Sequence, residues 1–208
     1  MPRIEPIEPE LATGKAKELL DELAGRGVQP GPMVRAMANA PALLRGYLDL
    51  SRAMKRTHLD RRIVERINLA VHEWLGCEYC LVAHTRAARQ LGLSDAEIEL
   101  ARQGTATDPK VAAMVALGRQ VIAGPGEITD AQIDELRNHG YTDEQIAEVA
   151  GLVALQLLTG GLNLVAGIEP APEDLAELTS RRRSSQITAP PGPPDSGNDH
   201  AGDGTHEH

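Results

Sequence analysis

The chain contains two cysteines, Cys77 and Cys80, which are separated by two residues and followed by His84. Glu65 lies twelve positions before the first cysteine, and His72 lies between Glu65 and Cys77. The thiolate is the reactive form of cysteine, and a nearby imidazolium or helix N-terminus lowers the thiol pKa from its usual value of ~8.5. A set of cysteine, histidine and carboxylate therefore provides what thiol chemistry requires.

The surrounding residues predict two helices that position this set. Helix-forming residues span roughly 61–75, Gly76 is a natural end, and a second helix is expected from near Cys77 to about Gln90. On that second helix Cys77, Cys80 and His84 are spaced by three and four residues, so they share one face.

Antiparallel packing of the two helices about the glycine predicts further contacts. Residues equidistant from the corner then meet, which places His72 opposite Cys80 and Asn68 opposite His84. Glu65 lies about one turn beyond, roughly 5 Å at ~1.5 Å per residue. The two helices are thus expected to bring their carboxylate, imidazole and thiol groups together in one site.

The whole stretch resembles the alkyl hydroperoxidase D-like branch of the carboxymuconolactone decarboxylase family. That family's pattern is a glutamate, eleven residues, and then Cys-x-x-Cys-x-x-x-His on paired helices, which Glu65, Cys77, Cys80 and His84 match. The resemblance covers roughly residues 35–167 and includes Asn39-Ala-Pro41 and Asn163. It implies an all-α helical bundle that associates as trimers or hexamers, with no cofactor and no metal.

The resemblance also implies a role for each residue. Cys80 would attack the terminal oxygen of a peroxide and become a sulfenic acid, which Cys77 resolves to a disulfide. His84 would take the thiol proton, Glu65 would orient or relay to His84, and a dithiol or protein reductant would restore the thiols. One electrostatic argument favours the opposite assignment, because Cys77 lies nearer the positive end of its helix. We therefore expect an antioxidant thiol peroxidase with Cys80 as the attacking residue, and His72 as a further candidate in the site.

Three alternatives remain open at this stage. The protein could be a disulfide reductase without peroxidase activity, or a lactone enzyme of the carboxymuconolactone decarboxylase type, although that branch does without the cysteine pair. It could also be a non-catalytic interaction module stabilised by zinc, with Cys77, Cys80 and His84 as ligands and His72 or Glu65 completing the shell.

Composition limits the class of partner and the type of core. Thirty acidic against 21 basic residues give a net charge of −9, which argues against nucleic acid or an anionic membrane surface as partner. Phenylalanine is absent, so the core must be mainly aliphatic. The N-terminus shows no apolar segment of a signal peptide, and we expect a cytoplasmic protein.

The rest of the chain is expected to form one helical domain over residues 1–180, followed by a disordered polar tail over 181–208. Residues 1–10 should be an extended arm, and Asn39 a helix N-cap. Further helices are predicted at 11–24, 41–55, 94–102, 108–124, 129–139 and 143–167. Residues 149–165 are the most apolar, but Gln156, Thr159 and Asn163 argue against a membrane span and favour a helix buried in the core or between subunits of a homo-oligomer.

Overall fold

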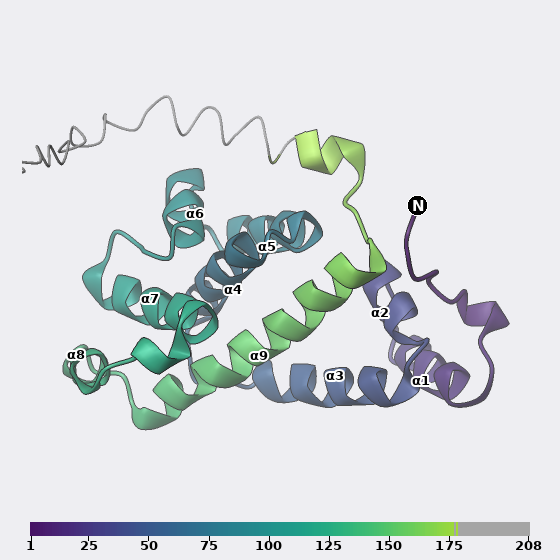
Figure 1. Cartoon of the computed structure of the whole chain (residues 1–208), viewed down its shortest axis with the longest axis horizontal. Coiled ribbons are helices and arrows are strands. Elements are labelled where there is room, and N and C mark those ends of the chain that lie inside the picture. The colour runs from purple at the N-terminus through teal and green to yellow at the C-terminus, as the bar shows by residue number, and fades with distance from the viewer. Residues whose placement is uncertain (177, 179–208) are drawn as a thin grey trace, which may run out of the picture.

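The computed structural model describes residues 1–176 and 178, and this part of the chain is all-α, as predicted (Figure 1). The predicted tail over 181–208 lies outside the described residues. Two short 3₁₀ turns, η1 (Pro9–Leu11) and η2 (Pro125–Glu127), accompany the α-helices. These helices are α1 (Gly14–Gly25), α2 (Pro32–Met37), α3 (Pro41–Met54), α4 (Arg61–Leu75), α5 (Glu78–Gln90), α6 (Asp95–Arg102), α7 (Pro109–Ala123), α8 (Asp130–Asn138) and α9 (Asp143–Ala166).

Helix α4 is the centre of the bundle. It packs against α5, α6, α7 and α9, and nine of its 15 residues are buried. Its apolar residues Ile63, Ile67 and Val71 recur at intervals of four and point toward α7 and α9. Because neighbours cover α4 on several sides, its polar residues are also carried into the interior, and this places the candidate site.

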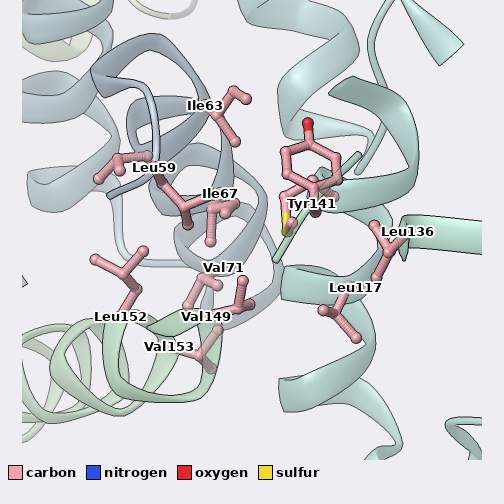
Figure 2. Packing of buried hydrophobic residues seen from close by; sticks show 12 residues of the cluster. Leu59, Ile63, Ile67, Val71, Leu117, Leu136, Tyr141, Val149, Leu152 and Val153 are labelled. Carbon is pink, nitrogen blue, oxygen red and sulfur yellow. The ribbon is translucent and has the colours of Figure 1, made fainter. Parts of the chain in front are cut away.

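The largest apolar cluster joins α4 to α7, α8 and α9. Figure 2 shows the residues of α4 on one side, Leu117 of α7 and Leu136 of α8 on another, and Val149, Leu152 and Val153 of α9 beneath them. Fully burying one such aliphatic side chain contributes about 1.5–3 kcal/mol. The cluster is aliphatic apart from Met114 and Tyr141, in agreement with the absence of phenylalanine.

The turn between α4 and α5 has the geometry that the sequence predicts. Asp60 caps the start of α4 by accepting a hydrogen bond from the backbone N–H of Arg62 at 2.8 Å. Gly76 ends α4 at a φ of +70°, a left-handed conformation that favours glycine. The N–H of Cys77 donates to the carbonyl of His72 at 3.1 Å, and α5 begins at the next residue.

Helix α9 crosses the bundle and contacts α3, α4 and α7 (Figure 1). A capping box between Thr142 and Gln145 opens it, and Gly167 closes it at a φ of +65°. Within the described residues it is the one helix long and apolar enough to cross a membrane, with half of its most apolar window buried in the protein. A core helix meets the same criterion, so this single helix does not indicate a membrane protein.

The N-terminal part differs from the prediction in four respects. The extended arm contains η1, and its Arg3 N–H donates to the carbonyl of Ala166 at 2.7 Å, which fastens the arm to the end of α9. Helix α1 begins at Gly14 rather than at residue 11, and α2 was not predicted. Asn39 is not the N-cap of α3: its side chain donates to the carbonyls of Glu5 and Ala36, because the arm offers these acceptors.

We expect Gly160→Ala to destabilise the protein by about 1–3 kcal/mol, the usual cost of overpacking. A Cβ at this position of α9 would lie 2.8 Å from Leu75 Cδ1 and 3.0 Å from His72 Nδ1 on α4, so the helices would have to separate. As a control, Gly46→Ala at an exposed position of α3 meets nothing within 4 Å and should stabilise by about 0.5–1 kcal/mol. Urea unfolding of both variants measures this, and equal effects would contradict the close approach.

Candidate active site

Three helices each contribute a row of polar residues to one interior region. In every row the residues are spaced by three and four positions, so they share one face of their helix. All the side chains are buried or half-buried. The rows are Glu65, Asn68 and His72 on α4; Cys77, Cys80 and His84 at the start of and along α5; and Gln156, Thr159 and Asn163 on α9.

The two cysteines form a disulfide at the N-terminus of α5. Cys77 is the N-cap and Cys80 the third residue of the helix, so both lie at its positive end. The amide of Asn163 on α9 donates a hydrogen bond to Cys80 Sγ at 3.3 Å. The helix N-terminus and this donor would both stabilise a thiolate on Cys80 after reduction. The dipole argument that favoured Cys77 therefore does not separate the two cysteines.

His84 is paired with Glu65 across the α4–α5 hairpin, the contact that the family resemblance implied, whereas the antiparallel packing argument placed Asn68 opposite His84. The distance between His84 Nδ1 and Glu65 Oε2 is 2.7 Å, and Asn68 Nδ2 lies 3.4 Å from the same nitrogen. Because the carboxylate only accepts, Nδ1 carries the proton and donates it, which leaves Nε2 of the neutral ring as the basic nitrogen. Glu65 thus fixes both the tautomer and the orientation of His84.

His72 is fully buried beside this pair. Its ring stacks on the ring of His84, with centroids 5.0 Å apart and planes inclined by 18°. Its Nε2 lies 2.9 Å from Gln156 Oε1 and donates to it, since an amide oxygen can only accept. Burial, reinforced by the neighbouring His84, lowers the pKa of His72 from 6.5 to about 3, so its ring is neutral at physiological pH.

A cavity of about 280 Å³ leads to these residues. Its deep end is lined by Cys80, His84 and Glu65, while Cys77 does not line it. The wall is largely apolar and is provided by α3, α4, α5 and α9, with side chains that include Tyr47, Met54, Val64, Tyr79, Leu152 and Leu155. A small molecule that enters the cavity therefore meets the sulfur of Cys80 and the imidazole of His84 together.

The chain is similar in sequence and in fold to known proteins. Residues 41–117, from the start of α3 into α7, match the profile of the "Carboxymuconolactone decarboxylase family". A peroxidase-related protein with an alkylhydroperoxidase AhpD core from Ralstonia eutropha JMP134 has a similar fold, with a TM-score of 0.69 over 84% of this chain and 94% of that chain at 23% identity. Over residues 41–117 the chain is similar to the carboxymuconolactone decarboxylase family. The fold of the chain is the AhpD-like all-α fold.

Other relatives show how widely this fold is used. The Bacillus subtilis (strain 168) protein YdfG is 24% identical over 118 residues, which are 55% of this chain and 80% of YdfG. A variant of the debrominase Bmp8, solved in complex with 2,3,4-tribromopyrrole, has a TM-score of 0.68 at 16% identity over 86% of this chain and 97% of that chain. At such identities the likeness to solved structures shows the fold alone.

One cluster that could hold a metal contains two of the predicted ligands, Cys77 and Cys80, but not His84. A ring nitrogen of His72 and the sulfurs of Cys77 and Cys80 all lie within 4.8 Å of one another. His84, the third zinc ligand considered from the sequence, is instead bonded through Nδ1 to Glu65. Three protein ligands are one fewer than a closed structural zinc site uses, and the sulfurs would have to be reduced first.

The row on α9 was missed as part of the site. Gln156, Thr159 and Asn163 were noted only as polar interruptions of an apolar helix, although Asn163 was also part of the family resemblance. Their spacing of three and four residues was a usable signal, because polar residues on one face of a buried helix require internal partners. What the sequence did not reveal is that this face meets Cys80 and His72.

Replacing His72 should flatten the acid branch of the stability curve. The unfolded histidine takes up a proton below pH 6.5 but the folded one only near pH 3, so wild type loses up to about 1.4 kcal/mol per pH unit as pH falls through this window. His72→Gln retains a donor for Gln156 but cannot take up a proton. Urea unfolding from pH 7 to pH 4 measures both slopes, and parallel curves would show that His72 is not buried as a neutral ring.

Proposed function

We propose that the protein is a thiol-dependent peroxidase that reduces hydroperoxides through a cycle between the Cys77/Cys80 dithiol and its disulfide. The observation that carries this proposal is the asymmetry of the pair: Cys80 lines the cavity, whereas Cys77 is bonded behind it. Similarity to the family over residues 41–117 and an intact Cys-x-x-Cys pair support a redox role. Structural neighbours that include a peroxidase-related protein and a debrominase support an enzyme.

In the proposed cycle the thiolate of Cys80 attacks the terminal oxygen of the hydroperoxide. The sulfur–oxygen bond forms as the oxygen–oxygen bond breaks, and the alkoxide leaves as an alcohol after taking a proton. Cys77 then attacks the sulfur of the sulfenic acid, water is lost and the disulfide forms. The Cys77/Cys80 dithiol supplies both electrons that reduce the hydroperoxide. An external dithiol or protein reductant must therefore return two electrons and two protons to the disulfide.

Proton transfer in this cycle is assigned to His84 and Glu65. Nε2 of His84 takes the proton of Cys80 and later gives it to the leaving alkoxide. The imidazolium formed meanwhile is stabilised by the carboxylate of Glu65, 2.7 Å from Nδ1. His72 acts as a positioning residue rather than as an acid or base, since its lowered pKa keeps it neutral while its ring supports that of His84.

Three considerations favour the proposed peroxidase over the alternatives. A protein disulfide reductase must bring a folded substrate to its attacking sulfur, and Cys80 is only 5% exposed at the end of a cavity. The lactone reaction leaves the disulfide without a role. A zinc-stabilised module would contain stoichiometric zinc in the freshly purified reduced protein, which metal analysis measures.

Self-association is also proposed. Ala154, Leu157, Leu164 and Val165 are exposed on α9 at helical spacing, and the two leucines expose 49% and 40% of their surface. Such an apolar stripe is suited to contact with a second copy of the chain. A mass measurement in solution decides between this arrangement and a monomer.

The two cysteines should fail in different ways. Cys80→Ser is expected to abolish hydroperoxide consumption, because no thiolate then faces the cavity. Cys77→Ser should allow one turnover and leave a sulfenic acid on Cys80, which a dimedone-type reagent labels and mass spectrometry locates. If Cys77→Ser is instead the inactive protein and Cys80→Ser turns over once, the two roles must be exchanged.

Glu65→Gln should slow the reaction of Cys80 by about 10²- to 10⁴-fold, the usual contribution of a general base. The amide keeps the size of the side chain but no longer stabilises the imidazolium of His84. Stopped-flow oxidation by hydroperoxide measures the rate, which should partly recover at high pH where the thiol ionises unaided. Glu10→Gln, at an exposed position near the N-terminus, is the charge-matched control. A wild-type rate in Glu65→Gln would show that Glu65 takes no part in the mechanism.

A further inference from the structure

We propose that the cavity selects hydroperoxides that carry a carboxylate, and that Lys55 and Arg61 bind this carboxylate at the cavity mouth. The inference rests on the proposed function, because it names the substrate class of the same site. It is drawn from the distribution of charge along the cavity, from the apolar character of its wall, and from its size.

Two cations line the mouth. Lys55 follows the end of α3 and Arg61 opens α4, so both lie beside the short connection between these helices, and both are exposed. Neither forms an ion pair with any residue that the structure describes, in a chain that carries nine more acidic than basic residues. Exposed unpaired cations are common in themselves, so their position at this cavity is what matters.

Three carboxylates beside the connection between α3 and α4 are engaged elsewhere. Asp60 accepts the helix-capping hydrogen bond from the N–H of Arg62. Glu144 and Glu148 of α9 lie within 3.3 Å and 3.1 Å of His58 Nδ1, and Glu148 also accepts from the backbone N–H of His58. Lys55 and Arg61 therefore remain available to an anion from solution.

The deep end has the opposite charge. Glu65 lies there beside His84, so an anionic group is repelled from the reacting centre and attracted to the mouth. A substrate with a carboxylate at one end and a hydroperoxide at the other would consequently enter with the hydroperoxide toward Cys80. The two cations and the buried carboxylate orient the substrate as well as bind it.

The wall between the two ends fits an apolar body. Met33, Tyr47, Met54 and Leu155 are among the side chains that line it. A volume of about 280 Å³ holds about nine water-sized groups at ~30 Å³ each. This is far more than hydrogen peroxide needs, and it suits a small aromatic or branched hydroperoxide whose carboxylate reaches the cations at the opening.

A matched pair of substrates tests the proposal. The hydroperoxide of 4-isopropylbenzoic acid and its methyl ester share one reacting centre and differ in a single charge. For wild type we expect a higher kcat/KM for the acid, mainly through a lower KM, and a preference that shrinks as NaCl is added. Equal kcat/KM values for acid and ester at low salt would overturn the proposal.

The double variant Lys55→Gln/Arg61→Gln locates the effect. Removing both cations takes away two exposed ion pairs with the substrate carboxylate. We therefore expect the acid-to-ester ratio of kcat/KM to fall about 3- to 30-fold in this variant. Arg56→Gln is the matched control, since Arg56 is adjacent and exposed but does not line the cavity. An unchanged ratio in the double variant, or an equal fall in the control, would overturn the assignment to Lys55 and Arg61.

A binding experiment separates this proposal from the peroxidase proposal. Calorimetry of 4-isopropylbenzoate with the disulfide form requires no turnover, so it remains informative even if wild type consumes neither hydroperoxide and the peroxidase proposal fails. Saturable binding that weakens about 3- to 30-fold in Lys55→Gln/Arg61→Gln but not in Arg56→Gln supports the carboxylate site. Absence of saturable binding, or equal binding by all three proteins, overturns it.

Discussion

The structure depends on the burial of α4, which other helices cover on several sides. The inward-facing polar side chains of a helix in this position cannot be hydrated by solvent. Each buried polar group without a hydrogen-bond partner destabilises the fold by about 1–3 kcal/mol. Glu65 and His72 are nevertheless buried on it, and each has a partner on a different helix: His84 on α5 and Gln156 on α9. The hydrogen bonds that Glu65 and His72 of α4 form with other helices therefore also assemble the site.

The pairing also gives the two histidines different chemical characters. His84 faces a carboxylate and the cavity, so a proton taken up at Nε2 is compensated by Glu65. His72 faces an amide oxygen in a fully enclosed position, so burial keeps it neutral and lowers its pKa to about 3. The two histidine rings stack with centroids 5.0 Å apart, and their different surroundings, not their residue type, give them different chemical properties.

Close packing of α9 is what makes this arrangement compact. Gly160 allows α9 to approach the ring of His72 and the side chain of Leu75, and this closeness brings the amide of Asn163 to Cys80 Sγ. One surface of α9 thus completes the deep end of the cavity, while another surface of the same helix exposes Leu157 and Leu164. The same helix would connect the site to an oligomer contact if the proposed self-association occurs.

The sequence by itself determined the local features of this protein. Helix ends followed from short-range chemistry, such as the cap at Asp60 and the left-handed Gly76, and the 3-and-4 spacing of Cys77, Cys80 and His84 fixed their common face. Because a tight turn forces neighbouring helices to pack antiparallel, the approach of Asn68 to His84 could also be predicted, with Glu65 about one turn away.

Only the tertiary structure decided what lies across the site. Asn163 and Gln156 are separated from Cys80 and His72 by more than eighty positions, and no local rule sets how α9 rotates against the hairpin. The same long-range packing placed Cys80 rather than Cys77 on the cavity and His72 rather than His84 beside the sulfurs. These outcomes depend on side-chain packing among α3, α4, α5 and α9, which optimises the fit of whole surfaces and is not encoded in the spacing of any one segment.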